Sequence, residues 1–269
     1  MLTTMPAALN QSCFPGLFTA RFVDIAAIVG ADAVELRPLD HPETPGEAAM
    51  AVRASGLPVA AVNALMDWAL PDDLDPRPAL ITLLEIAVAV EAPLVVCVAP
   101  IRAGRLPPRT TIARSAAERL AMLAEVARPA GVQLALEQVG RSSTRPDAVS
   151  GIRHLDDALA IAVAAAADVL LVADSYNLAT ADEDFDVLRA IPGRRLGIAH
   201  LVDAEGGARA MPGIGNLDLP RFVRALGATS YSGALSLELF PRTPWPDPLS
   251  FAREAIAAVR RGVGWASTV

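Results

Sequence analysis

Residues 132–137 read Val-Gln-Leu-Ala-Leu-Glu, a short apolar run that ends in a single carboxylate. A run of this length and composition predicts a buried β-strand. The same pattern recurs three times further along the chain, each time after about one strand–helix–strand unit. These later runs are Asp-Val-Leu-Leu-Val-Ala-Asp ending at Asp174, Arg-Leu-Gly-Ile-Ala-His ending at His200, and Ala-Leu-Ser-Leu-Glu ending at Glu238.

The whole chain alternates between strand-like and helix-like segments. The predicted strands are 6–10, 32–37, 58–63, 94–99, 132–137, 168–174, 195–200 and 234–239. The predicted helices are 17–29, 44–55, 77–91, 110–129, 154–166, 183–190, 217–227 and 249–262. This alternation favours an α/β fold, a single (β/α)8 TIM barrel spanning residues 1–269. A doubly wound open sheet is the alternative, but 11–16 lack the glycine-rich phosphate turn expected after its first strand.

The composition agrees with strands covered on both faces, since 53% of the 269 residues are hydrophobic and 4% are aromatic. A net charge of −7 argues against nucleic acid or an anionic membrane as partner. The chain shows neither a signal peptide at its start nor an apolar run of ~20 residues. Cys13 and Cys97 form no disulfide framework and suit a reducing compartment, so we expect a cytoplasmic protein. A homo-oligomer is compatible with the sequence.

All 23 basic residues are arginines. The lack of lysine excludes Schiff-base chemistry through the protein, and with it lysine-type aldolases and pyridoxal enzymes. With no lysine and no evident basic cluster, the sequence favours an unphosphorylated small-molecule substrate. Arg209 alone could still bind a phosphate.

The strand ends define a candidate site, because the carboxyl ends of parallel barrel strands meet at one mouth. Glu137, Asp174, His200 and Glu238 should converge there, and two Glu, one Asp and one His suit an oxygen-rich divalent-metal site. Each alone has an ordinary explanation, such as a salt bridge for Glu137 or a turn cap for Asp174. Four such residues at the same end of consecutive predicted strands favour the metal site.

Two further segments have open interpretations. Glu35, near the end of the second predicted strand, either pairs with Arg37 or lines the cavity floor. Arg209 and 212–216 follow the strand that ends at His200. They form either a flexible loop with turn glycines or a substrate loop, in which Arg209 reaches a hydroxyl, carbonyl or phosphate oxygen.

These segments resemble the xylose-isomerase-like TIM-barrel family within the sugar phosphate isomerase/epimerase superfamily. The resemblance covers nearly the whole chain. It rests on Leu134–Gly140, Val172–Asn177, Ile198–Asp203 and Leu235–Phe240, together with the loop of Arg209 and 212–215. Val34–Arg37 and Val62–Leu65 are similar to the inosose (2-keto-myo-inositol) isomerase branch in particular.

The resemblance implies one divalent metal ion held by Glu137, Asp174, His200 and Glu238. Mn²⁺, Mg²⁺ or Co²⁺ fit this ligand set best, and Zn²⁺ is compatible with it. The implied reaction is isomerisation or epimerisation of a ketose or inosose through a metal-stabilised enediolate, with a place in inositol catabolism. Glu137 and Glu238 would then be the catalytic proton shuttle.

Asn177, Arg209, Glu35 and Asn63 are the candidate substrate-binding residues. Asn177 stands where the family usually has His, three residues after the metal-binding Asp. Because an amide does not titrate near neutral pH, we expect Asn177 to orient a substrate hydroxyl or carbonyl rather than to act as acid or base.

Three other functions remain open. A dehydratase (lyase) of an inosose or a dehydroshikimate-like ketone would use the same metal and expel a β-hydroxyl group. A non-catalytic sugar-binding barrel is supported only by Asn177. A barrel endonuclease normally carries several zinc ions on many histidines, and three histidines with a negative net charge disfavour it.

Overall fold

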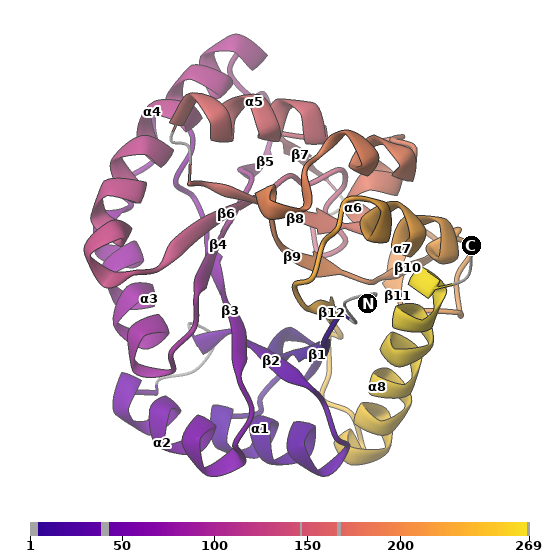
Figure 1. Cartoon of the computed structure of the whole chain (residues 1–269). Coiled ribbons are helices and arrows are strands. Elements are labelled where there is room, and N and C mark those ends of the chain that lie inside the picture. The colour runs from indigo at the N-terminus through magenta and orange to yellow at the C-terminus, as the bar shows by residue number, and fades with distance from the viewer. Residues whose placement is uncertain (1–4, 39–42, 146, 166–167, 268–269) are drawn as a thin grey trace.

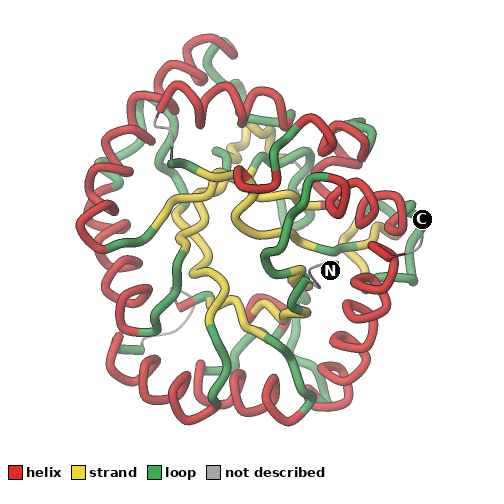
Figure 2. The backbone as a smooth tube through the Cα atoms, in the orientation of Figure 1, coloured by secondary structure: helices red, strands yellow, loops and turns green. Residues whose placement is uncertain are grey.

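The computed structural model describes residues 5–38, 43–145, 147–165 and 168–267. Eight parallel strands close into a barrel in the order β1-β12-β9-β8-β6-β4-β3-β2, and a ring of helices surrounds it (Figures 1 and 2). The predicted (β/α)8 TIM barrel is therefore confirmed. The barrel strands are β1 Ala7–Asn10, β2 Ala33–Leu36, β3 Val59–Leu65, β4 Leu94–Val98, β6 Gln133–Glu137, β8 Leu170–Asp174, β9 Leu196–His200 and β12 Leu235–Leu237.

The helices follow the strands in chain order. They are α1 Thr19–Ile28, α2 Pro45–Ser55, α3 Arg77–Ala89, α4 Arg109–Ala127, α5 Leu155–Ala165, α6 Ser175–Thr180, α7 Leu219–Ala228 and α8 Pro248–Gly264. Two small antiparallel two-stranded sheets lie outside the barrel: β5 Ile101–Ala103 with β7 Ala148–Ser150, and the hairpin of β10 Asp203–Glu205 with β11 Ala208–Ala210.

Several helices begin at residues that satisfy their free backbone N–H groups. Thr44 and Glu47 form a reciprocal capping box at α2. Asp218 and Asp247 cap α7 and α8, and a proline stands in the first turn of all three helices. Each such cap contributes about 1 kcal/mol to stability. The sequence therefore fixes these helix starts locally.

The apolar core has three clusters. The largest lies between the strands and the surrounding helices, and the two smaller ones lie in the barrel interior. Interior positions alternate along each strand, so Ala135, Val172 and Ile198 point into the barrel. The residues two positions further on, at the strand ends, point inward as well. This alternation directs Glu137, Asp174 and His200 toward one point above the apolar interior.

The structure differs from the sequence prediction at three places. Residues 175–180 form helix α6, since the Asp174 carboxylate accepts a hydrogen bond from the Asn177 backbone N–H (2.7 Å) and starts a helix directly after β8. The helix predicted at 183–190 is a 3-10 helix, Phe185–Ala190, because Ile191 precedes a proline and is disfavoured in a helix. β12 ends early, at Leu237, where the chain leaves the ladder and Leu239 N–H donates to Cys13 Sγ (3.2 Å).

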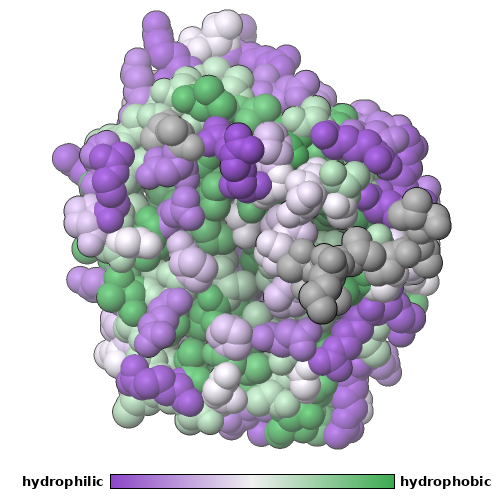
Figure 3. All heavy atoms as spheres, in the orientation of Figure 1, coloured by the Kyte–Doolittle hydropathy of each residue, from purple (hydrophilic) through white to green (hydrophobic). Residues whose placement is uncertain are grey.

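Hydrophilic side chains gather around the periphery of the molecule, over the outer helices (Figure 3). Within the described ranges, no helix combines the length and apolarity needed to cross a bilayer.

Candidate metal centre and substrate cavity

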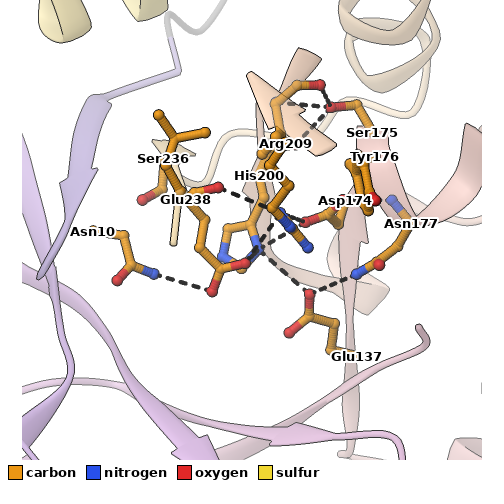
Figure 4. A network of polar contacts seen from close by, with 12 residues as sticks. Asn10, Glu137, Asp174, Ser175, Tyr176, Asn177, His200, Arg209, Ser236 and Glu238 are labelled. Carbon is orange, nitrogen blue, oxygen red and sulfur yellow. Dashed lines mark hydrogen bonds and ion pairs between the residues drawn. The ribbon is translucent and has the colours of Figure 1, made fainter. Parts of the chain in front are cut away.

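The barrel register brings four predicted residues together at the carboxyl ends of the strands. Glu137, Asp174 and His200 are the last residues of β6, β8 and β9, and Glu238 directly follows β12. Asp174 lies opposite His200 in the β8–β9 pairing. One potential ligand atom from each of the four residues lies within 4.8 Å of the other three, and all four residues are buried (Figure 4).

The Nδ1 atom of His200 points at the three carboxylates. It lies 3.4 Å from Asp174 Oδ2 and 3.6 Å from both Glu137 Oε1 and Glu238 Oε2. Two ligands bound about 2.1 Å from one metal, at angles near 90–110°, are themselves roughly 3.0–3.5 Å apart. Nδ1 is also buried with no hydrogen-bond partner in the described chain. The donor set and its spacing therefore fit a divalent metal ion.

The other nitrogen of His200 is held by Glu35. His200 Nε2 lies 3.2–3.3 Å from the two Glu35 oxygens, which also accept hydrogen bonds from Ser236 Oγ (2.9 Å) and Asn63 Nδ2 (3.0 Å). A carboxylate at Nε2 keeps the proton there and leaves Nδ1 as the ligand atom. Glu35 is fully buried behind the imidazole. This position favours a role in holding His200 over direct contact with a substrate.

Asparagine side chains hold the two glutamates. Asn177 Nδ2 donates to Glu137 Oε1 (2.9 Å), and Asn63 Nδ2 donates to Glu238 Oε1 (2.8 Å). Asn63 and Asn177 both line the cavity, and their Oδ1 atoms are buried without a partner in the described residues.

Asn10, which sequence reasoning missed, also contacts the site. It is the last residue of β1, and its Nδ2 lies 3.4 Å from Glu238 Oε1. The available signal was its place at the end of the first strand, two positions after Ala8, which packs inside the barrel.

Residues 212–216 lie outside helices and strands, as expected of a loop, but Arg209 belongs to strand β11 and reaches the site from there. Its Nη1 lies 2.7 Å from Asp174 Oδ2 and 3.2 Å from Glu238 Oε2. Its guanidinium also stacks on Tyr176 and Phe240, at 4.9 and 5.4 Å from the ring centroids. Arg209 thus contacts the same two oxygens that face His200 Nδ1.

Burial and neighbouring charges shift several pKa values. Burial, together with the nearby Glu137 and Glu35 carboxylates, raises the pKa of Glu238 to about 7 despite His200 and Arg209. Burial also opposes ionisation of Asp174, but Arg209 and His200 outweigh it and lower its pKa to about 2. Burial would lower the pKa of His200, but Glu35 and Glu238 raise it well above its ordinary value. Without metal, a proton therefore occupies the His200 ligand position.

A cavity of about 120 Å³, partly open to solvent, borders the metal centre. Glu137 and Glu238 form part of its lining, together with Asn63, Asn177 and Arg209. Apolar residues, which the sequence did not indicate, also line the cavity: Met66, Val98 and Ile101 near the end of β4, and Phe240 after β12.

These features define a (β/α)8 barrel with a candidate divalent-metal centre at the carboxyl ends of its strands. The sequence model of the xylose isomerase-like TIM barrel family matches residues 23–262. The chain therefore belongs to the xylose isomerase-like TIM barrel family, as its motifs indicated.

Curated relatives cover part of the chain. An inosose isomerase of Bacillus velezensis is 30% identical over 138 residues, which are 48% of this chain and 47% of that protein. An L-ribulose 3-epimerase of Mesorhizobium japonicum is 27% identical over 174 residues, 58% of this chain and 55% of that protein. The chain thus spans about half the length of the curated relatives it matches.

Solved structures share the fold over nearly the whole chain. A crystal structure of the IolI protein with a binding zinc atom aligns with a TM-score of 0.82 at 23% identity, covering 98% of each chain. A structure of L-ribulose 3-epimerase aligns with a TM-score of 0.82 at 21% identity, covering 97% of this chain and 95% of that one.

Proposed function

We propose that this protein is a divalent-metal-dependent isomerase or epimerase of a ketose or a cyclic keto-polyol such as an inosose. The observation that carries the proposal is the pair of carboxylates, Glu137 and Glu238, which line one cavity beside the same imidazole nitrogen. Moving a proton between adjacent carbons, or between the two faces of one carbon, needs a group that removes it and a group that returns it. Two carboxylates on different strands can supply both.

Glu137, Asp174, His200 and Glu238 would hold the ion. When bound, the ion would polarise the substrate carbonyl and so make the adjacent carbon-bound proton easier to remove. Three carboxylates and one imidazole favour Mn²⁺, Mg²⁺ or Co²⁺, and Zn²⁺ is compatible with the same set.

The two glutamates have different surroundings, which suits opposite roles. Glu238 is held through Oε1 by Asn63 and Asn10, and its pKa is raised to about 7. Glu137 is held through Oε1 by Asn177, while its Oε2 makes no hydrogen bond or ion pair to the described residues. Glu137 Oε2 is thus the carboxylate oxygen best placed to take a proton from a substrate carbon.

The neighbouring polar groups would orient the substrate. Asn63 and Asn177, which line the cavity, would orient its hydroxyl groups. Arg209, which lines the cavity, would donate to its oxygens. The relatives named inosose isomerase and L-ribulose 3-epimerase support this substrate class and a place in the inosose isomerase branch.

A proton-exchange assay tests the proposal. Protein loaded with Mn²⁺, Mg²⁺ or Co²⁺ is incubated in D₂O with L-ribulose, D-fructose or myo-inosose, and deuterium next to the carbonyl is followed by NMR. We expect metal-dependent exchange with at least one ketose. Glu137→Gln and Glu238→Gln should lose ~10²–10⁴-fold in rate while still binding metal. Glu118→Gln, an exposed control on α4, should keep full activity.

Other outcomes would overturn the proposal. A product lighter by one water molecule would identify the dehydratase alternative. Ketose binding without exchange under any metal would favour the non-catalytic sugar-binding barrel. Near-normal exchange in both Gln variants would exclude Glu137 and Glu238 as the proton shuttle.

A further inference from the structure

Arginine side chains form a large part of the lining of the cavity at the metal centre. The described lining contains four arginines and two glutamates, and the two glutamates are the proposed metal ligands at the bottom. Arg37, Arg141 and Arg145 line the cavity in addition to Arg209. The cavity is therefore acidic where the metal would bind and basic around its other lining residues, in a protein whose net charge is −7.

The segment Arg141-Ser-Ser-Thr-Arg145, which follows β6, forms one side of this lining. Arg141 N–H donates to Thr180 Oγ1 (3.1 Å), and Arg145 N–H donates to Ser142 Oγ (3.0 Å). These contacts tie the segment to the end of α6 and close it on itself. Ser142, Ser143 and Thr144 all contribute to the lining. The segment therefore brings hydroxyl groups and two guanidinium groups to the same cavity.

Phe240 joins two other arginines of the lining. The Arg37 guanidinium lies 5.3 Å from the centroid of the Phe240 ring, and the Arg209 guanidinium lies 5.4 Å from the same centroid. Arg37 follows β2, whereas Arg209 belongs to β11. The fold thus gathers cationic groups from three distant parts of the sequence, which is why no basic cluster was evident before.

An exposed arginine can bind a ligand through its charge only if that charge is not already paired with an acidic side chain. Whether Arg141 and Arg145 form ion pairs is therefore decisive. In the part of the chain that the structure describes, neither Arg141 nor Arg145 forms an ion pair. Arg145 also borders a hollow lined by Asp67, Asp72 and Asp73. Asp72 and Asp73 bind Arg102, and no ion pair joins Asp67 to Arg145 in the described chain. Arg141 has no acidic neighbour of this kind in the lining other than the metal-site glutamates. Its charge is available to a ligand.

We propose that the substrate carries an anionic group, a phosphate ester or a carboxylate, which the Arg141–Arg145 segment and Arg37 bind at the end of the cavity away from the metal. The proposal rests on the proposed function for the position of the substrate carbonyl. Guanidinium groups bind both kinds of oxyanion through paired, charge-assisted hydrogen bonds. The serine and threonine hydroxyls can donate further hydrogen bonds to the same oxygens. A carboxylate would agree with the unphosphorylated substrate that the sequence favours, whereas a phosphate ester would not.

Paired probes test the proposal by titration calorimetry on the metal-loaded protein. The probes are D-ribulose with D-ribulose 5-phosphate, and D-fructose with D-fructuronate. We expect one anionic member to bind at least ~10-fold more tightly than its neutral counterpart, which corresponds to one charge-assisted hydrogen bond. Arg141→Gln/Arg145→Gln should remove that preference. Arg114→Gln/Arg253→Gln removes the same charge at exposed sites on α4 and α8 and should retain it.

The two arms identify the anion, and the remaining outcomes separate this proposal from the proposed function. A preference for the phosphate ester or for the carboxylate supports the site and assigns its ligand. Equal affinity for the neutral and anionic members of both pairs would overturn it, even if neutral ketoses are isomerised. An anion preference that survives Arg141→Gln/Arg145→Gln would also overturn it. Tight, arginine-dependent binding without proton exchange would refute the isomerase function and leave the anion site standing.

Discussion

Replacing Glu35 by Gln tests whether the metal centre depends on the residue behind its histidine. The Glu35 carboxylate lies 3.2–3.3 Å from His200 Nε2, on the side of the imidazole away from the three acidic ligands. Gln keeps nearly the same shape but removes the negative charge. We therefore expect Glu35→Gln to bind metal more weakly although all four proposed ligands remain.

The magnitude follows from the distances. With Nε2 in contact with Glu35 and Nδ1 across the ring, the carboxylate and the bound ion would be about 7 Å apart, given a metal–nitrogen distance of roughly 2.1 Å. A single negative charge and a divalent ion at about 7 Å attract each other by ~5 kcal/mol at an effective dielectric constant of 20. Solvation of the ion and relaxation of the site reduce this value. Loss of an outer-shell partner typically weakens metal binding 10–100-fold, or about 1.4–2.7 kcal/mol, and we expect this range.

The pH dependence of metal affinity provides a second, independent test of the role of Glu35. Glu35 also raises the pKa of His200, so in the native protein a proton competes with metal for this ligand. Metal affinity should therefore fall as the pH decreases through the raised His200 pKa. Removing the Glu35 charge lowers the His200 pKa, so acidification should begin to weaken metal binding at a lower pH in Glu35→Gln than in the native protein. The difference in metal affinity between native protein and Glu35→Gln is then largest at high pH and becomes smaller as the pH falls.

Competition with a fluorescent chelator, titrated with Mn²⁺ or Zn²⁺ from about pH 6 to pH 9, measures both effects. Ser236→Ala is the matched control, since it removes one neutral hydrogen bond to Glu35 (2.9 Å) and keeps the charge. It should change the affinity by less than Glu35→Gln does. Native metal affinity in a folded Glu35→Gln protein at about pH 9 would refute the role assigned to Glu35.

Three other predictions concern the surroundings of the site. Asn177→Ala should weaken substrate binding or turnover at least several-fold, measured by kinetics at saturating metal. Because Asn177 Nδ2 donates to the proposed ligand Glu137 (2.9 Å), metal affinity should also fall, by at most ~10–100-fold, in chelator competition. Unchanged kinetics would remove Asn177 from the site. Gly140→Ala should lower the free energy of unfolding by about 1–3 kcal/mol in denaturant titrations, because a Cβ there would overlap the Asn177 backbone oxygen. Cys13 and Cys97 are fully buried, and burial raises the pKa of both thiols to about 12. Neither thiol should therefore react with a disulfide reagent at pH 8 until the protein unfolds. Rapid labelling of the folded protein would contradict this prediction.

The barrel could be predicted from the sequence because its strands are short apolar runs bounded by local helix signals. Thr44, Asp218 and Asp247 each cap a helix within a few residues of their own position, so local rules suffice. Features that depend on distant contacts were missed. The β10–β11 hairpin is braced by Asp203, whose carboxylate accepts hydrogen bonds from the Gly213 and Gly215 backbone N–H groups (both 3.0 Å). No local sequence pattern predicts that contact.

The candidate site was predictable to the extent that its residues are ionisable. An ionisable side chain at the end of a buried apolar strand is costly unless it has a partner or a ligand. This cost identifies Glu137, Asp174, His200 and Glu238 as candidates from the sequence alone. The neutral amide of Asn10 costs less to bury than a charge, so the sequence did not identify it as a site residue. The arginines of the cavity lining come from segments far apart in the chain, so only the closed barrel reveals that they share one cavity.

The alternation of inward and outward side chains along each barrel strand explains which site residues could be predicted from the sequence and which could not. In six strands, an inward apolar residue is followed two positions later by an inward polar one: Ala8 and Asn10, Ala33 and Glu35, Ala61 and Asn63, Ala135 and Glu137, Val172 and Asp174, Ile198 and His200. β4 departs from this pattern, since Val96 is followed by Val98, which lines the cavity. The polar ring is thus open toward β4, beside Met66 and Ile101. A substrate held by the polar side would turn its C–H groups toward this apolar side, which leaves its oxygens to the metal centre and the asparagines.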